Sequence, residues 1–248
     1  MQGRLDAGER LVPQEVTPRH IGIVGCSAEG AALCYRTLCA EAPAVLGPHA
    51  HPEITLHTPS LALYVEALER GDLERVAALM LDSADKLARA GAELLICPDN
   101  TIHQAMPQVR PRSPRPWLHI AEVVADEAAA RGLRRLGVLG TRWLMDSSVY
   151  PTALAERDIA CVMPDAATRE RVSRVIMDEL VPTGTASAAG MTALLAAVQT
   201  LKNEGCDAVV LGCTELPLVL GDHNVALPTL DSTRLLARAA LRRAVRSA

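Results

Sequence analysis

Residues 94–103, with the sequence LLICPDNTIH, and residues 209–216, with the sequence VVLGCTEL, decide the fold. In each segment an apolar run leads directly into small polar residues. A buried parallel strand carries functional groups to its carboxyl end in this way. When the two segments are overlaid without gaps, Asp99 falls on Cys213 and Asn100 falls on Thr214, each pair 114 positions apart.

A second pair of segments repeats at nearly the same separation. Residues 21–26, IGIVGC, resemble residues 136–141, LGVLGT, which lie 115 positions later. Two matched strand-to-loop junctions predict two similar α/β lobes related by a pseudo-two-fold duplication. Because predicted strands alternate with predicted helices, each lobe is expected to be a parallel sheet flanked by helices. Asp99 and Cys213 are then expected to face each other across an interlobe cleft.

The proline-rich, basic stretch around residues 107–116 is the predicted domain boundary. We expect residues 1–17 to form a flexible leader, since the stretch from residue 1 to residue 20 is charged and carries two prolines. The first α/β lobe is predicted to comprise residues 18–115 plus 225–248. The second lobe is predicted to comprise residues 116–224.

The composition excludes several classes of protein. Aromatic residues are 2% of the chain and the formal net charge is −4, which argues against a nucleic-acid surface. No apolar run approaches the roughly 18 residues needed to span a membrane. The 7 cysteines form no CxxC pair, which favours a reducing cytoplasm and gives no sign of a zinc cluster. Histidines at 49, 51 and 57 lack helical ligand spacing, so no metal site is predicted.

Cys213 is the first candidate catalytic residue. It follows a glycine at a predicted strand end and precedes a predicted helix start, so backbone amides are expected to stabilise the thiolate and lower the pKa of the thiol below about 8.5. The alternative is that Cys213 is a small buried hydrophobic residue, as most cysteines are.

Asp99 is the second candidate. At the end of a buried strand its carboxylate can simply cap the following turn. In a closed cleft opposite another acidic group, burial and like charge would instead raise its pKa from about 3.9 and allow it to act as a general base or acid.

Two motifs, NTIH at residues 100–103 and GCTE at residues 212–215, resemble those of the aspartate/glutamate racemase family. The glycine-containing junctions at residues 21–25 and 139–142 resemble that family too, and the resemblance extends from about residue 19 to 245. The resemblance implies a two-lobed enzyme that needs no cofactor, neither pyridoxal phosphate nor metal. In that family two cysteines face opposite sides of the substrate α-carbon, one removing the α-proton and the other returning it. Cys213 matches the second cysteine, whereas Asp99 occupies the place of the first.

The resemblance also assigns substrate contacts and an assembly. Asn100, Thr101 and Thr214 match positions that grip the substrate carboxylate and amine, Thr141 matches a further polar contact, and a homodimer is implied. The first loop departs from the family pattern, because it reads Gly25-Cys26-Ser27. We therefore expect a reshaped pocket, with Cys26, Ser27 and Glu215 among the substrate-binding residues.

The leading expectation is an isomerase, a racemase or epimerase of an acidic amino acid such as aspartate or glutamate, with Asp99 and Cys213 as opposed acid/base groups. Two alternatives stay open. One is a lyase or isomerase on the same scaffold, such as a decarboxylase or a maleate-type cis–trans isomerase, that uses Cys213 alone. The other is a non-catalytic binder of a small carboxylate.

Overall fold

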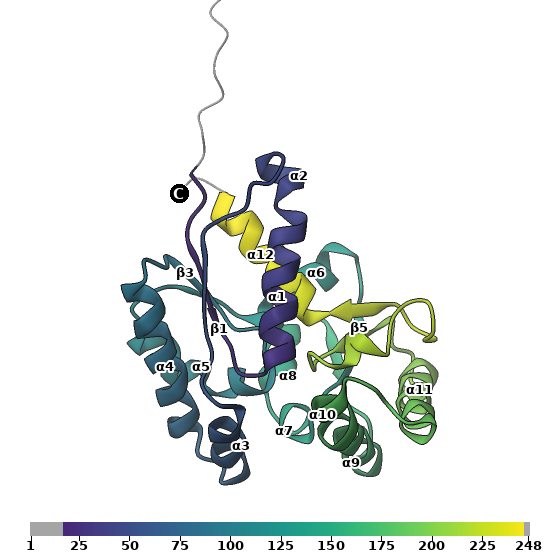
Figure 1. The fold of residues 1–248 in the computed structure, drawn as a ribbon. Coiled ribbons are helices and arrows are strands. Elements are labelled where there is room, and N and C mark those ends of the chain that lie inside the picture. Colours follow the sequence, from purple (N-terminus) through teal and green to yellow (C-terminus); the bar gives the residue numbers. More distant parts are fainter. Residues whose placement is uncertain (1–16, 246–248) are drawn as a thin grey trace, which may run out of the picture.

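The computed structural model describes residues 17–245, so the leader predicted for residues 1–17 lies outside the described chain except at its last position. Two four-stranded parallel sheets form the core of the described part, with strand orders β2-β1-β3-β4 and β6-β5-β7-β8. Helices flank both sheets (Figure 1). The predicted α/β class with two similar lobes is confirmed.

The first sheet consists of β1 (Ile21–Val24), β2 (Ile54–His57), β3 (Leu94–Ile96) and β4 (Trp117–Leu118). Around it and after it run α1 (Ala28–Glu41), α2 (Pro43–Leu46), α3 (Leu61–Glu69), α4 (Leu73–Arg89), a 3₁₀ turn (Thr101–Ala105), α5 (Met106–Val109), a second 3₁₀ turn (Arg110–Arg112) and α6 (Ile120–Ala130). The large α4 is amphipathic and begins at Asp72, whose side chain accepts a hydrogen bond from the Arg75 backbone N–H.

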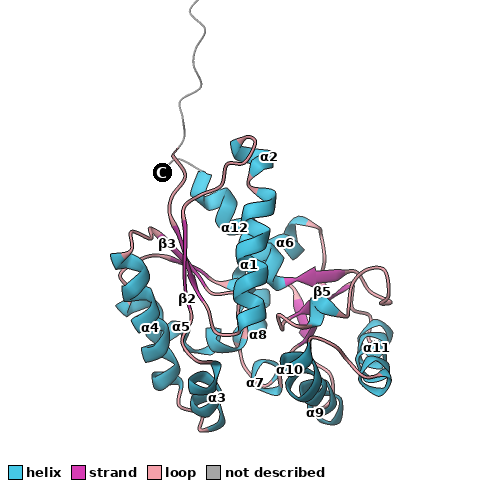
Figure 2. Ribbon diagram, in the orientation of Figure 1, coloured by secondary structure: helices cyan, strands magenta, loops and turns pink. Residues whose placement is uncertain are grey.

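The second sheet consists of β5 (Arg135–Leu139), β6 (Ala160–Val162), β7 (Ala208–Leu211) and β8 (Thr229–Asp231). Its flanking segments are α7 (Arg142–Met145), α8 (Val149–Ala155), α9 (Ala166–Arg174), a π-helical stretch (Val175–Leu180), α10 (Val181–Thr183), α11 (Ala188–Asn203), a 3₁₀ turn (Leu216–Leu218) and α12 (Ser232–Val245). Figure 2 shows the two sheets separated by helices.

The duplication appears in strand pairing and in backbone conformation. β1 pairs with β3 as β5 pairs with β7, in each case as parallel central strands. Gly91 and Gly205, the residues that end α4 and α11, both have positive φ, 99° and 80°. Because only glycine adopts this conformation without strain, both turns require it. The two lobes therefore repeat a helix–glycine–strand unit that ends at the polar motifs.

The strand pairing crosses the predicted lobe boundaries at both places. β4 follows residue 115, yet it pairs with β3 in the first sheet. β8 follows residue 225, yet it pairs with β7 in the second sheet. Both are edge strands of two or three residues, too short to carry a periodic pattern that would assign them to a sheet.

The two lobes share a hydrophobic core. Helix α12 packs against both α1 and α6 between the sheets (Figure 1). Their buried side chains join those of β1, β5 and β7 in one continuous cluster. Burial of apolar surface across this junction holds the carboxyl ends of both sheets at one place. Within residues 17–245 no helix is long and apolar enough to cross a membrane.

Candidate active site

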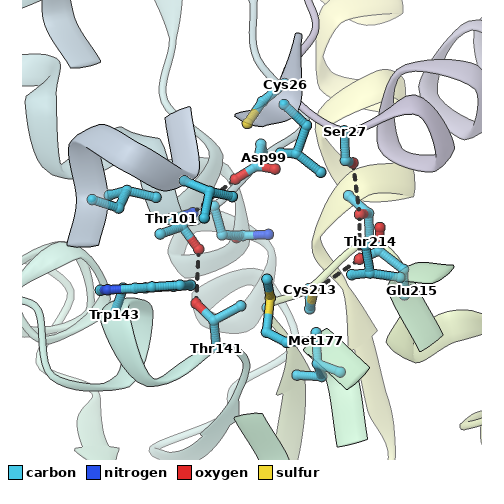
Figure 3. A pocket seen from close by; sticks show the side chains of 17 residues that line it. Cys26, Ser27, Asp99, Thr101, Thr141, Trp143, Met177, Cys213, Thr214 and Glu215 are labelled. Carbon is cyan, nitrogen blue, oxygen red and sulfur yellow. Dashed lines mark hydrogen bonds between the residues drawn. The ribbon is translucent and has the colours of Figure 1, made fainter. Parts of the chain in front are cut away.

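A cavity lies at the carboxyl ends of the two central strands of each sheet (Figure 3). β1 leads to Cys26 and Ser27, and β3 leads to residues 99–101. β5 leads to Thr141, and β7 leads to residues 212–215. In parallel α/β sheets this edge is where ligands bind. The complete lining is Cys26, Ser27, Leu61, Val65, Leu68, Asp99, Asn100, Thr101, Thr141, Trp143, Ile176, Met177, Val181, Gly212, Cys213, Thr214 and Glu215.

Asp99 lies in this cavity on the turn after β3. Its Oδ1 accepts a hydrogen bond of 3.2 Å from the Thr101 backbone N–H. Burial raises the pKa of Asp99 from 3.8 to about 6, and the nearby Glu215 carboxylate adds to the rise, while hydrogen bonds from Cys26 and from backbone N–H groups act against it. The predicted direction of this shift agrees with the structure. A carboxyl group with such a pKa exchanges protons near neutral pH.

Cys213 lies in the same cavity on the turn after β7. Its Sγ donates a hydrogen bond of 2.9 Å to Glu215 Oε2. Burial raises the pKa of the Cys213 thiol well above its ordinary value, and the Glu215 carboxylate raises it further. The prediction that a helix start lowers this pKa is therefore wrong. The helix that follows is a three-residue 3₁₀ turn, and the adjacent carboxylate outweighs the backbone amides.

Asp99 and Cys213 differ from the other polar side chains of the lining in their exposure. Both are partly exposed, although the residues beside them are not. The buried polar lining residues are Cys26, Ser27, Asn100, Thr101, Thr141, Thr214 and Glu215. In Figure 3 Asp99 and Cys213 approach the cavity from the loops of different lobes. One carboxyl group and one thiol are thus the polar side chains that a bound molecule reaches first.

Cys26 lies beside Asp99 and is 4% exposed (Figure 3). Burial raises the pKa of its thiol well above the ordinary value, and the charge of Asp99 raises it further. The group is therefore a neutral thiol, and it donates a hydrogen bond to the Asp99 carboxylate. The sequence predicted Cys26 in the pocket, and in the structure it lines the cavity beside Asp99.

The predicted hydroxyl groups join the two lobes in pairs. Ser27 Oγ and Thr214 Oγ1 are 3.1 Å apart, and Thr214 Oγ1 also donates to Glu215 Oε2 over 2.8 Å. Gly30 permits this approach, because a Cβ atom there would lie 2.4 Å from Thr214 Cγ2. The two hydroxyl groups and the carboxyl group of this cluster come from two loops, and Ser27 and Thr214 are 187 positions apart.

A second hydroxyl pair lies on the opposite wall. Thr101 Oγ1 and Thr141 Oγ1 are 3.0 Å apart, and Thr141 also caps α7 by accepting a hydrogen bond from the Leu144 N–H. Thr101 follows β3 of the first sheet, and Thr141 follows β5 of the second. The pair is buried and fixes the spacing between the lobes at this wall.

The Asn100 side chain makes hydrogen bonds within the junction between the lobes, a role that the sequence did not predict. Its Oδ1 accepts a hydrogen bond of 2.6 Å from the Tyr150 hydroxyl, and its Nδ2 donates to Ser232 Oγ over 2.9 Å. Ser232 Oγ in turn donates to the Leu211 carbonyl over 2.8 Å. Tyr150 and Ser232 were not predicted, because no sequence pattern links them to residue 100.

An apolar wall was also missed. Leu61, Val65 and Leu68 present one face of α3 to the cavity at helical spacing. The second lobe adds Trp143, Ile176, Met177 and Val181. The spacing within α3 was a signal in the sequence, but it is the same signal that a core helix gives.

Among residues 17–245 no group of three or more His, Cys, Asp or Glu side chains is arranged to hold a metal ion. The histidines around position 51 serve other contacts. For example, His57 Nδ1 lies 2.9 Å from Ser83 Oγ.

The fold and the cavity define a class: two-lobed α/β proteins that place acid/base side chains from both lobes around one interlobe site. A sequence model of the Asp/Glu/Hydantoin racemase family matches residues 21–240. The chain belongs to this family.

Individual relatives agree with the assignment. The chain is 26% identical over 170 residues to the broad-specificity amino-acid racemase RacX of Bacillus subtilis, covering 67% of this chain and 71% of that protein. A candidate Asp/Glu racemase from Yersinia pestis has a similar structure, with a TM-score of 0.83 and 29% identity over 92% of this chain and 100% of that one. An aspartate racemase homologue from Pyrococcus horikoshii matches with a TM-score of 0.77 and 26% identity over the same shares.

Proposed function

We propose that the protein is a cofactor-independent amino-acid racemase or epimerase in which Asp99 and Cys213 act on opposite faces of the substrate α-carbon. One observation carries the proposal: these two are the partly exposed polar side chains of an otherwise buried polar lining, and they follow the equivalent strands β3 and β7. A single cavity between duplicated lobes suits a reaction that needs one acid/base group on each face.

The protonation states give each group a starting role. With a pKa of about 6, Asp99 is a carboxylate at pH 7.5 and accepts the α-proton. The raised pKa of Cys213 keeps its thiol protonated, so Sγ delivers its proton to the opposite face of the carbanion. The product is the inverted amino acid, with Asp99 protonated and Cys213 as thiolate. The reverse reaction starts from these exchanged states.

Negative charge develops on the substrate carboxylate as the α-proton leaves. The donors available at the strand ends are the Thr101–Thr141 hydroxyl pair and the second N–H of the Asn100 amide. Prearranged donors of this kind stabilise an enolate-like intermediate. The Glu215 carboxylate, two residues after Cys213, is placed to hold the substrate ammonium.

The substrate class and the assembly extend the proposal. An acidic amino acid is what the resemblance and the names of several relatives suggest. The resemblance implies a homodimer, and the spacing of the cysteines favours the cytoplasm. Light scattering of the purified protein tests the dimer.

Solvent exchange tests the function. Each enantiomer of a panel of amino acids is incubated with the protein in D₂O, and α-deuterium is followed by NMR while inversion is followed by chiral chromatography. A racemase labels both enantiomers. A lyase that protonates one face labels only its product, and a binder labels nothing.

Single variants sharpen the result. Cys213→Ala and Asp99→Asn are each expected to abolish inversion but to retain exchange of opposite enantiomers, because each keeps one of the two bases. Cys39→Ser, a thiol change on α1 outside the cavity, serves as the control and should behave as wild type. If the Asp99→Asn protein inverts its substrate at the wild-type rate, Asp99 has no acid/base role and only caps the turn after β3.

A further inference from the structure

We propose that this site takes an α-amino acid with an apolar, aliphatic side chain in preference to aspartate or glutamate. The inference rests on the proposed acid/base function and adds the class of substrate side chain. Two independent features of the cavity carry it: the apolar wall and the balance of charge.

The apolar wall faces the cavity without a partner to cover it. Six of its side chains are partly exposed, namely Leu61, Val65, Leu68, Trp143, Met177 and Val181. Three come from the first lobe and three from the second, so the wall lines both sides of the entrance. An aliphatic substrate side chain would remove this surface from water, which is favourable in proportion to the area buried. A carboxylate placed there would lose its hydration and gain no hydrogen bond.

The charge of the cavity lining also favours an aliphatic substrate side chain over an acidic one. Its ionisable acidic side chains are Asp99 and Glu215, and none of the seventeen lining residues is Lys, Arg or His. The ammonium and the α-carboxylate of any amino acid balance each other in this site. The second carboxylate of an acidic substrate would add a negative charge near two others, with no cation to pair with it.

The hydroxyl donors do not supply a second carboxylate site. Ser27, Thr214 and Glu215 bond to one another, and Thr101 bonds to Thr141. These groups lie at the strand ends beside Asp99 and Cys213, where the α-carboxylate must bind. A distal carboxylate on the substrate would point away from them, toward α3 and the π-helical stretch.

Arg142 is a cationic residue beside the cavity that could pair with a substrate carboxylate if its side chain turned inward. It lies next to a lining residue, with its guanidinium carbon 4.9 Å from the Trp143 ring centroid. Its side chain is exposed and does not line the cavity. The cation–π attraction between the Arg142 guanidinium and the Trp143 indole stabilises this position of the arginine side chain outside the cavity.

The experiment compares substrates of similar shape and different charge. Leucine and aspartate form one such pair, and methionine and glutamate form another. Inversion and α-deuterium exchange are measured for each with the wild-type protein. We expect kcat/KM to be at least about 10-fold higher for the aliphatic member of each pair, as an uncompensated charge in an apolar pocket requires.

A matched pair of variants tests the wall directly. Val65→Lys places a cation on the cavity face of α3 and should raise the aspartate-to-leucine ratio of kcat/KM by about 10-fold or more. Leu63→Lys places the same cation on α3 at a residue that is 38% exposed and outside the lining. It should leave the ratio unchanged.

The outcomes separate the two proposals. If aspartate and glutamate react as fast as leucine and methionine or faster, the racemase function stands and the apolar preference is overturned. If aspartate turnover dominates and collapses in Arg142→Ala, that arginine turns into the site, which overturns the preference as well. If no amino acid of either class exchanges its α-hydrogen, the proposed function fails and this inference fails with it.

Discussion

Cys213 and Glu215 are joined by a hydrogen bond of 2.9 Å in which the thiol donates to the carboxylate, although they are only two residues apart. The same oxygen, Oε2, accepts the Thr214 hydroxyl at 2.8 Å. One buried carboxylate thus holds two donors in the loop after β7. Together with burial, this carboxylate raises the pKa of the Cys213 thiol, and through its charge it also raises the pKa of Asp99.

Glu215→Gln should therefore alter both proposed catalytic groups. Without the carboxylate charge, the pKa of Cys213 and the pKa of Asp99 both fall toward their ordinary values. We expect faster alkylation of Cys213 by iodoacetamide at pH 8 and a shift of the acid limb of kcat/KM to lower pH. Loss of a charged partner for the substrate ammonium, worth about 1.5–3 kcal/mol, should raise KM about 10- to 100-fold.

The control for this variant is Glu66→Gln on α3, where the carboxylate is exposed and pairs with Arg70. It removes a negative charge near the site without touching the cavity lining. Alkylation of Cys213 at an unchanged rate in Glu215→Gln would show that the hydrogen bond does not govern the thiol.

Asp99 should make the folded protein less stable as the pH rises. Its folded-state pKa, about 6, lies above the unfolded value of 3.8, so the folded state binds more protons between these two pH values. The free energy of unfolding then decreases as pH rises through this window, by about 3 kcal/mol in total. Asp99→Asn lacks this decrease. Its stability relative to wild type should grow from pH 3.5 to pH 7 in urea unfolding, and parallel curves for the two proteins would refute the assignment.

Cys26 should act on the reaction through Asp99. Its thiol donates a hydrogen bond that stabilises the Asp99 carboxylate and lowers the pKa of that group. In Cys26→Ala the pKa of Asp99 rises further, so the acid limb of kcat/KM should move to higher pH by about half to one pH unit. Cys26→Ser, which keeps a donor, should restore the limb. A fall in kcat with no movement of the limb in either variant would indicate a packing role only.

The fold and the two central residues were predictable because they depend on local signals. Buried parallel strands are continuous apolar runs, and the polar residues that end them in the two halves match position by position. That overlay by itself predicts that Asp99 and Cys213 line one cavity, as they do in the structure. The racemase motifs at residues 100–103 and 212–215 supported the same arrangement.

Other features depend on contacts that no short stretch encodes. The predicted pKa direction of Cys213 is wrong because burial of the thiol, and after it the position of the Glu215 carboxylate, outweigh the influence of the helix start. The apolar wall on α3 has the spacing of an ordinary core helix. The π-helical stretch at Val175–Leu180, which brings Met177 to the cavity, has no recognised sequence pattern.

Asn100 gives a prediction that separates a structural role from substrate binding. Its amide bonds to Tyr150 and Ser232, so Asn100→Ala leaves the buried Tyr150 hydroxyl without its acceptor. We expect a loss of about 1–3 kcal/mol in the free energy of unfolding, seen as a lower Tm. Combined with Tyr150→Phe, the two changes should cost less than their sum, with a coupling of about 0.5–3 kcal/mol.

Thr152→Ala, an exposed change on the same helix as Tyr150, is the control and should leave Tm within about 1–2 °C of wild type. If Asn100 serves mainly to grip the substrate carboxylate, Asn100→Ala raises KM while Tm and the additivity with Tyr150→Phe stay unchanged. A coupled loss of stability instead assigns Asn100 to the junction that holds β3, α8 and the start of α12 together. The two candidate bases depend on that junction, because Asp99 precedes Asn100 directly and Ser232 holds the carbonyl that ends β7, two residues before Cys213.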